Sequence, residues 1–157
     1  MKTNTLITPA EVVDLAFGGA GNLRVEDVSE ATIVAAQRKY LLPVFGEALL
    51  EEMIEGAHGD LVEEFIKPSL ALYVKRLLLP SLAAKVGVSG VVRYVGEGYT
   101  EVDEKTLHRL MRRTKADADV MLDAAVDYVE LNPQGFPNYV AANNIRNRLN
   151  IDSGIVL

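Results

Sequence analysis

The sequence contains no cysteine, and its only histidines are His58 and His108. The lack of cysteine excludes disulfides, thiolate nucleophiles and cysteine-ligated metal sites. Neither histidine has a partner at the spacing of a metal motif such as HExxH. The sequence also lacks a P-loop, a dinucleotide-binding glycine motif after a strand, and a G-x-S-x-G nucleophile elbow. We therefore expect no enzymatic activity, no cofactor and no bound metal.

Positive charge is also scarce, since the formal net charge is -6 and the pI is about 4.9. This balance argues against specific nucleic-acid binding and against attachment to an anionic membrane, because both need a positive field. The longest apolar stretch, residues 69–84, is shorter than the ~20 residues of a membrane span and carries Lys75 and Arg76 at its centre. It is typical of a core helix. Residues 1–7 hold no apolar run of signal-peptide length, so we expect the protein to stay where it is made.

The 157 residues fit one domain, 1–157, without an internal repeat or linker. Apolar residues at helical spacing predict a mainly α fold, a bundle of four to six helices with a small β-hairpin-like insertion. Thr8 before Pro9 predicts the start of an N-terminal helix, and Asp60 predicts the start of a later one. Pro43 predicts the end of a helix or a kink. The predicted helices cover residues 9–17, 27–43, 44–55, 60–86 and 103–130, with a shorter segment at 136–144.

The final long helix is predicted to turn one apolar stripe inward, formed by Leu107, Leu110, Met111, Ala118, Met121, Leu122, Ala125 and Val129. Before it, residues 88–102 place β-branched and aromatic residues around Gly96-Glu97-Gly98. This pattern predicts a hairpin, with an ordinary ordered loop as the alternative. The last residues, 145–157, are predicted to form a flexible tail that docks only when a partner is present.

Charged residues on the final long helix form a stripe with two halves. The basic half is Lys105, Arg109 and Arg112, and the acidic half is Asp119, Asp123 and Asp127. This order opposes the helix dipole, which favours acids at the N-terminus and bases at the C-terminus. Contacts between copies would explain it, because the basic half of one subunit could face the acidic half of the next and close a ring. The alternatives are two unrelated solvated patches and, for the aspartates, a divalent-cation site.

Several short motifs together resemble the head–tail connector (adaptor) proteins of tailed bacteriophages, particularly a group carried in prophages of Bacteroides-like bacteria. The motifs are Tyr40-Leu41-Leu42-Pro43-Val44-Phe45-Gly46, Lys67-Pro68, Val88-Ser89-Gly90-Val91, Asn132-Pro133 and Phe136-Pro137. The resemblance covers most of the chain.

The resemblance implies a structural subunit that assembles into a ring of about a dozen copies beneath the portal and extends the DNA channel toward the tail. It implies assembly in the cytoplasm of a bacterial host and a final place in the virion neck. The expected partners are copies of itself, the portal protein and a tail or head-closure protein, while DNA only passes through the lumen. Segments with little core of their own supply the candidate partner contacts: Val91, Arg93, Tyr94, Tyr99, Arg146 and Arg148.

Other classes of protein stay open. Within a virion, another neck or tail-completion protein would share this composition. Outside one, the chain could be a helical protein-interaction, regulatory or scaffolding module, with Arg38-Lys39, Lys75-Arg76 and Arg146-x-Arg148 as weak nucleic-acid contacts. The net charge and the lack of a basic recognition helix argue against nucleic-acid binding.

Overall fold

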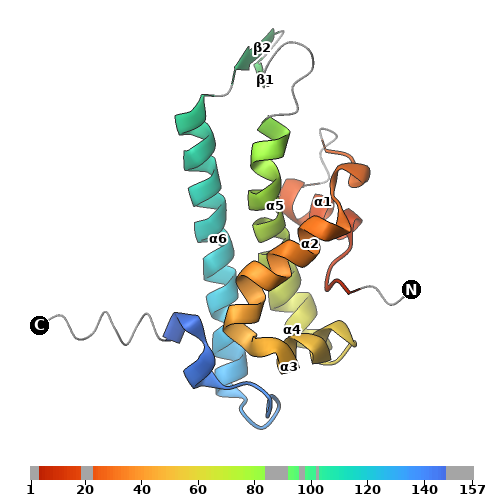
Figure 1. Cartoon of the computed structure of the whole chain (residues 1–157), viewed down its shortest axis with the longest axis vertical. Coiled ribbons are helices and arrows are strands. Elements are labelled where there is room, and N and C mark those ends of the chain that lie inside the picture. The colour runs from red at the N-terminus through yellow and green to blue at the C-terminus, as the bar shows by residue number, and fades with distance from the viewer. Residues whose placement is uncertain (1–3, 19–22, 84–91, 96–97, 102, 148–157) are drawn as a thin grey trace, which may run out of the picture.

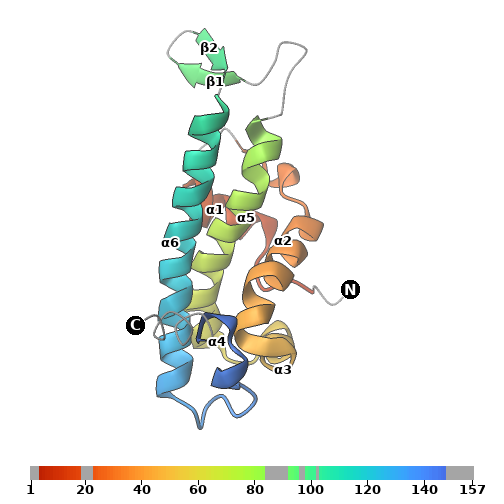
Figure 2. The same ribbon diagram turned by 60° about the vertical axis from the view of Figure 1, so that its left-hand side comes forward.

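The computed structural model describes residues 4–18, 23–83, 92–95, 98–101 and 103–147, and it confirms a mainly helical protein. Two long helices, α5 (Lys67–Ala83) and α6 (Glu104–Leu131), lie antiparallel and side by side (Figures 1 and 2). Helices α1 (Pro9–Phe17) and α2 (Glu30–Ala36) pack against α5 on the side away from α6. Helix α5 is therefore the centre of the fold, and α6 forms one outer edge.

The predicted start of α1 is confirmed. The Thr8 hydroxyl accepts a hydrogen bond from the backbone N–H of Glu11 at 3.3 Å, and the Glu11 carboxylate accepts one from the Thr8 N–H at 2.8 Å. This reciprocal capping box satisfies two N–H groups that the helix itself leaves unpaired. The start of α6 is built in a related way, since the Asp103 carboxylate accepts from the Thr106 N–H at 2.7 Å.

Pro43 and Pro68 are each preceded by a π-helical turn. The turn η2 (Gln37–Leu41) joins α2 to α3 (Leu42–Ile54), and the turn η3 (Val62–Ile66) joins α4 (Gly59–Leu61) to α5. A proline in a regular α-helix clashes with the carbonyl four residues earlier, and the wider π turn relieves this crowding. The helical path therefore continues through Pro43 and Pro68.

The predicted end or kink at Pro43 falls instead at Gly46, whose φ of 78° and ψ of 166° interrupt α3. The predicted cap at Asp60 is also wrong. His58 precedes α4 with a left-handed φ of 59°, and Asp60 lies inside the helix. The tight turn after α3 determines this start, because the chain reverses direction over residues 55–58.

Helix α5 confirms the predicted core helix. Its side chains Leu70, Tyr73 and Val74 have no measurable exposure. The two charged residues at its centre reach out of the core, since Lys75 Nζ donates to the Ala16 carbonyl at 2.9 Å and Arg76 donates to the Met111 carbonyl at 3.2 Å. No helix in the described part of the chain is long and apolar enough to cross a membrane.

The predicted inner stripe of α6 is confirmed at four of its positions and is wrong at Leu110 and Met121. Ala118, Leu122, Ala125 and Val129 are buried, together with Thr114 and Val126, which the prediction omitted. Leu110 and Met121 are 43% and 40% exposed, so they do not belong to the core. The reason is that α5 covers α6 from one side only, which leaves these positions beside the contact.

Between α5 and α6, strands β1 (Val92–Val95) and β2 (Gly98–Glu101) pair antiparallel, with Tyr94 opposite Tyr99. They lie at the end of the long helix pair, away from α3 (Figure 1).

After α6, the predicted segment at 136–144 is helical only in its last part, since residues 137–138 form a turn and the short 3-10 helix η4 (Ala141–Asn143) begins after them. Pro137 prevents an earlier helix, since it disfavours helical geometry at the residue before it.

We predict that Gly46→Ala lowers the free energy of unfolding by about 1–3 kcal/mol, because its φ and ψ lie in a region that only glycine adopts readily. Chemical denaturation monitored by circular dichroism measures the change. Gly59→Ala is the matched control. An added Cβ meets no atom within 4 Å at either position, so only the backbone conformation differs. The control is expected to leave the stability unchanged or raised by up to about 1 kcal/mol; equal effects at the two positions would contradict this account.

Candidate functional site

The outer face of α6 is open to solvent and carries the basic half of the predicted stripe. Lys105, Arg109 and Arg112 are exposed, and none of them makes a hydrogen bond or ion pair with the described residues. Arg113, which the sequence prediction did not include, is exposed in the same way. Four cationic side chains within three turns are thus available to a partner.

The acidic half is different, because the chain itself occupies part of it. Asp119 accepts hydrogen bonds from the Tyr73 hydroxyl at 2.6 Å and from Lys115 Nζ at 2.5 Å. The Arg146 guanidinium reaches across from the C-terminal segment, with Nε 2.7 Å from Asp123 Oδ1 and another nitrogen 3.4 Å from Asp119 Oδ1. Of the three predicted aspartates, Asp127 alone is exposed without a described partner.

The environment of this cluster shifts several pKa values. Burial raises the pKa of Asp119, but the hydrogen bonds from Lys115 and Tyr73 and the nearby charge of Arg146 outweigh it and hold the pKa below its usual value. Burial and the bond to Asp119 raise the pKa of the Tyr73 phenol far above the physiological range. Burial lowers the pKa of Arg146, and the bond to Asp123 more than offsets that effect. Asp119 and Arg146 are therefore ionised together, and the Tyr73 phenol is a neutral donor.

The C-terminal segment is anchored before it reaches this cluster. Phe136 is 7% exposed and Asn144 is completely buried. The Asn144 amide donates to the Tyr139 hydroxyl at 2.9 Å, and its side-chain oxygen accepts from the Arg146 backbone N–H at the same distance. Burial and a hydrogen bond to Glu130 raise the pKa of Tyr139 to about 12. Residues 145–147 of the predicted flexible tail are thus bound to α6, and the remainder, 148–157, lies outside the described residues.

The predicted partner contacts do not form one surface. Arg93, Tyr94 and Tyr99 belong to the strands at one end of the helix pair (Figure 1), whereas Arg146 contacts Asp119 and Asp123 near the middle of α6. Val91 and Arg148 lie outside the described residues.

Sequence reasoning also missed Tyr73, because its hydrogen bond to Asp119 joins residues 46 apart in the chain. It missed Asn144 as well, although the bonds of Asn144 to Tyr139 and Arg146 are local. The sequence could have identified Lys115 as an ion-pair partner of Asp119, since it precedes Asp119 by four residues on the same helix.

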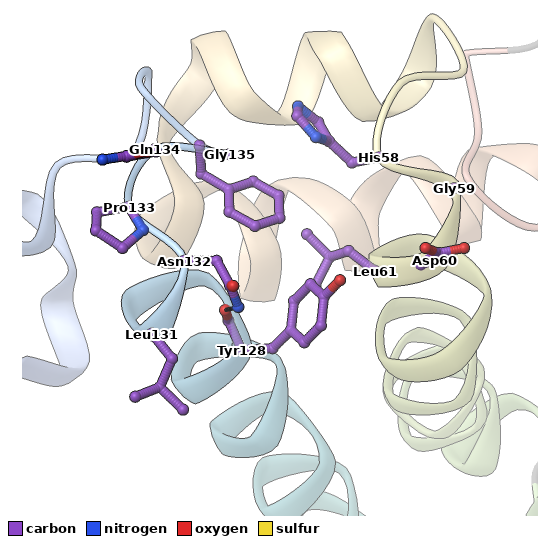
Figure 3. A pocket seen from close by; sticks show the side chains of 11 residues that line it. His58, Gly59, Asp60, Leu61, Tyr128, Leu131, Asn132, Pro133, Gln134 and Gly135 are labelled. Carbon is purple, nitrogen blue, oxygen red and sulfur yellow. Dashed lines mark hydrogen bonds between the residues drawn. The ribbon is translucent and has the colours of Figure 1, made fainter.

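A separate pocket of about 670 Å³ lies where the end of α6 approaches the start of α4. Figure 3 shows Tyr128 and Leu61 beside each other within it, with His58 across from the loop of Pro133 and Gln134. The His58 ring lies 4.8 Å from that of Phe136, and its Nε2 is 2.9 Å from Glu52 Oε2. His58 therefore packs within the turn between α3 and α4. No group of three or more metal-ligating side chains converges in the described part of the molecule.

These features define a mainly helical protein whose outer helix exposes a basic cluster in its first half and binds the C-terminal segment through an arginine. Residues 25–148 match the family of unknown function DUF6712, and the chain belongs to that family. Neither a curated protein nor a solved structure matches the chain.

The depressed pKa of Asp119 predicts an acid-sensitive contribution to stability. The unfolded carboxyl has the higher pKa, so on acidification the unfolded state binds its proton first and the native state loses stability. The contribution is complete above the ordinary aspartate pKa of about 3.9 and is lost as the pH falls through the lower native value. We expect Asp119→Asn to cost about 1–3 kcal/mol at pH 7 and to flatten the stability profile in acid.

Urea denaturation at a series of pH values measures both effects. Asp127→Asn is the matched control, because it removes an exposed carboxylate from the same helix. The control should leave the profile close to that of the wild type. An acid slope that is the same for Asp119→Asn and the wild type would show that the cluster does not contribute.

Proposed function

We propose that this protein is a structural subunit of the neck of a tailed bacteriophage, a head–tail connector that forms a ring and extends the DNA channel below the portal. The observation that carries the proposal is the outer face of α6, where Lys105, Arg109, Arg112 and Arg113 are exposed and unpaired within the described chain. A solitary protein gains nothing from such a cluster, because like charges within one or two helical turns repel each other. Opposite charges on a neighbouring subunit would relieve that repulsion.

The motifs that resemble the connector family support the same role. The segment from Tyr40 to Gly46 holds part of the π turn, the proline and the glycine kink that orient α3 against α2. Asn132-Pro133 and Phe136-Pro137 build the loop that returns the chain from α6 to the arginine clamp. These residues thus determine the shape of the subunit, and shape is what a ring component contributes.

The insertion that carries β1 and β2 has a position suited to a partner. It joins α5 to α6 at the end of the helix pair, so it projects beyond the packed helices (Figures 1 and 2). An isolated two-stranded hairpin is marginal in water, and contact with another protein stabilises it. We assign this end of the subunit to contact with the portal, or with a tail or head-closure protein. No catalytic step is part of the proposal.

A second candidate is another neck or tail-completion protein, or a helical interaction module outside a virion. The charged face of α6 would serve such a protein equally, but its partner would be a different protein instead of a second copy. Self-association is therefore the property that separates the candidates.

We predict that the purified protein forms a ring of about a dozen subunits that weakens as salt rises from about 0.05 to 0.5 M, since ionic screening acts on exposed charge pairs. Size-exclusion chromatography with light scattering over a wide range of protein concentration measures the mass, and negative-stain electron microscopy shows whether the particle is closed. Binding to duplex DNA, measured in the same buffers, is the control and is expected to be weak.

A chain that stays monomeric alone, and in the presence of a portal ring, would contradict the connector function. Tight, salt-sensitive duplex binding would favour a nucleic-acid module instead. A monomer that assembles only on a portal ring would retain the function with the portal as template.

A further inference from the structure

A groove of about 630 Å³ lies between α2 and α3, on a part of the molecule that the proposed site does not use. Its apolar lining comes from Val34, Leu42, Leu50 and Ile54. Leu50 is buried, whereas the other three are only half-buried and thus keep apolar surface in contact with water. Such surface is stabilised when another apolar side chain covers it, by about 25 cal/mol per Å².

The rim of the groove is acidic. Glu47 and Glu51 are exposed, lie one helical turn apart on α3, and make no hydrogen bond or ion pair with the described residues. Glu55 continues the same line by a further turn. Among the described residues of the lining, Arg38 is the one basic residue. The balance of charge around the groove is therefore negative, and it favours a cationic occupant.

The outer face of α6 offers a matching surface. Leu110 is 43% exposed, and it follows Arg109 and precedes Arg113 by three residues. The two arginines are four residues apart, the same spacing as Glu47 and Glu51. Side chains four residues apart on a helix lie about 6 Å from each other, so the two pairs have the same repeat along their helices.

These two surfaces cannot meet within one chain. Residues 109–113 lie on the part of α6 nearest the β strands, while α3 lies at the opposite end of the molecule and on the other side of α5 (Figures 1 and 2). The contact must therefore join different copies. It uses a different patch on each copy, so a pair of subunits keeps one unused donor face and one unused groove, which further copies can bind.

We propose that the groove between α2 and α3 binds the Arg109–Arg113 turn of a second copy of this chain, with Leu110 in the groove and the two arginines paired with Glu47 and Glu51. The inference rests on the proposed ring function and names the surfaces that join neighbouring subunits. The groove also replaces the acidic half of α6 as the expected partner of the basic half, because Arg146 already binds Asp119 and Asp123 there. A repeated contact of this kind closes into a ring when its rotation permits.

The test is a pair of charge-reversal variants of the full chain. The first carries Arg109→Glu and Arg113→Glu, and the second carries Glu47→Arg and Glu51→Arg. In each variant alone, donor face and groove carry the same sign, and we expect the association constant to fall by at least about a hundredfold. When the two variants are mixed, each donor face meets a groove of opposite sign, so assembly should return to within about tenfold of the wild type.

Circular dichroism confirms that each variant folds. Asp60→Arg with Glu64→Arg is the matched control, because these exposed acids are also four residues apart, make no ion pair with the described residues and lie outside the groove lining. Assembly of the wild type that neither reversal weakens would overturn the proposed contact and leave the ring intact.

Assembly that follows the charge pairing but yields open chains would support the contact and count against the connector function. A wild type that stays monomeric at every concentration, with no heterodimer in the mixture, would overturn the contact, while portal-templated assembly would still test the function separately.

Discussion

The hydrogen bond from the Tyr73 hydroxyl to Asp119 joins the centre of the protein to its outermost helix. Tyr73 is completely buried, and its ring stacks on Tyr40 with the centroids 4.0 Å apart. A buried hydroxyl without a partner costs about 1–3 kcal/mol, so α6 must present an acceptor at this point. The acceptor is a charged carboxylate, and it attracts Lys115 and Arg146. The acceptor that the buried Tyr73 hydroxyl requires thus also binds the C-terminal segment, which Phe136 and Asn144 anchor before it reaches Asp119.

The two π turns impose a second constraint, on the path of the chain. Each lies at the same offset before a proline, at Gln37–Leu41 before Pro43 and at Val62–Ile66 before Pro68. Because the wider turn accommodates the proline ring, the helical path is kept and the change of direction moves to other residues. The chain changes direction at Gly46 and His58, which both have positive φ. The groove between α2 and α3 exists because that change of direction occurs after Pro43 and not at it.

Local signals predicted the elements, and contacts between distant residues determined the site. Thr8 and Pro9 predicted the start of α1, since capping depends on neighbours a few residues apart. Apolar spacing predicted α5 and the second half of α6. It failed at Leu110, because periodicity gives the direction of a face but not the extent to which a neighbouring helix covers it. The charged stripe was visible in the sequence, yet no spacing rule could reveal that Arg146, 27 residues beyond Asp119, occupies its acidic half.

The occupied acidic half changes what the stripe can do. With Asp119 and Asp123 paired within the chain, the first half of α6 keeps a cluster of free cationic charges at Lys105, Arg109, Arg112 and Arg113. The chain as a whole has a net charge of -6, so its uncompensated acids lie elsewhere, and Glu47 and Glu51 on α3 are among them. A molecule that is acidic overall but basic at one end has an electrostatic direction, because like ends repel and unlike ends attract. This uneven distribution of charge favours head-to-tail contacts over symmetric dimers. Arg146 contributes to it, because it binds Asp119 and Asp123 of α6 and leaves the cationic side chains of that helix without those two partners.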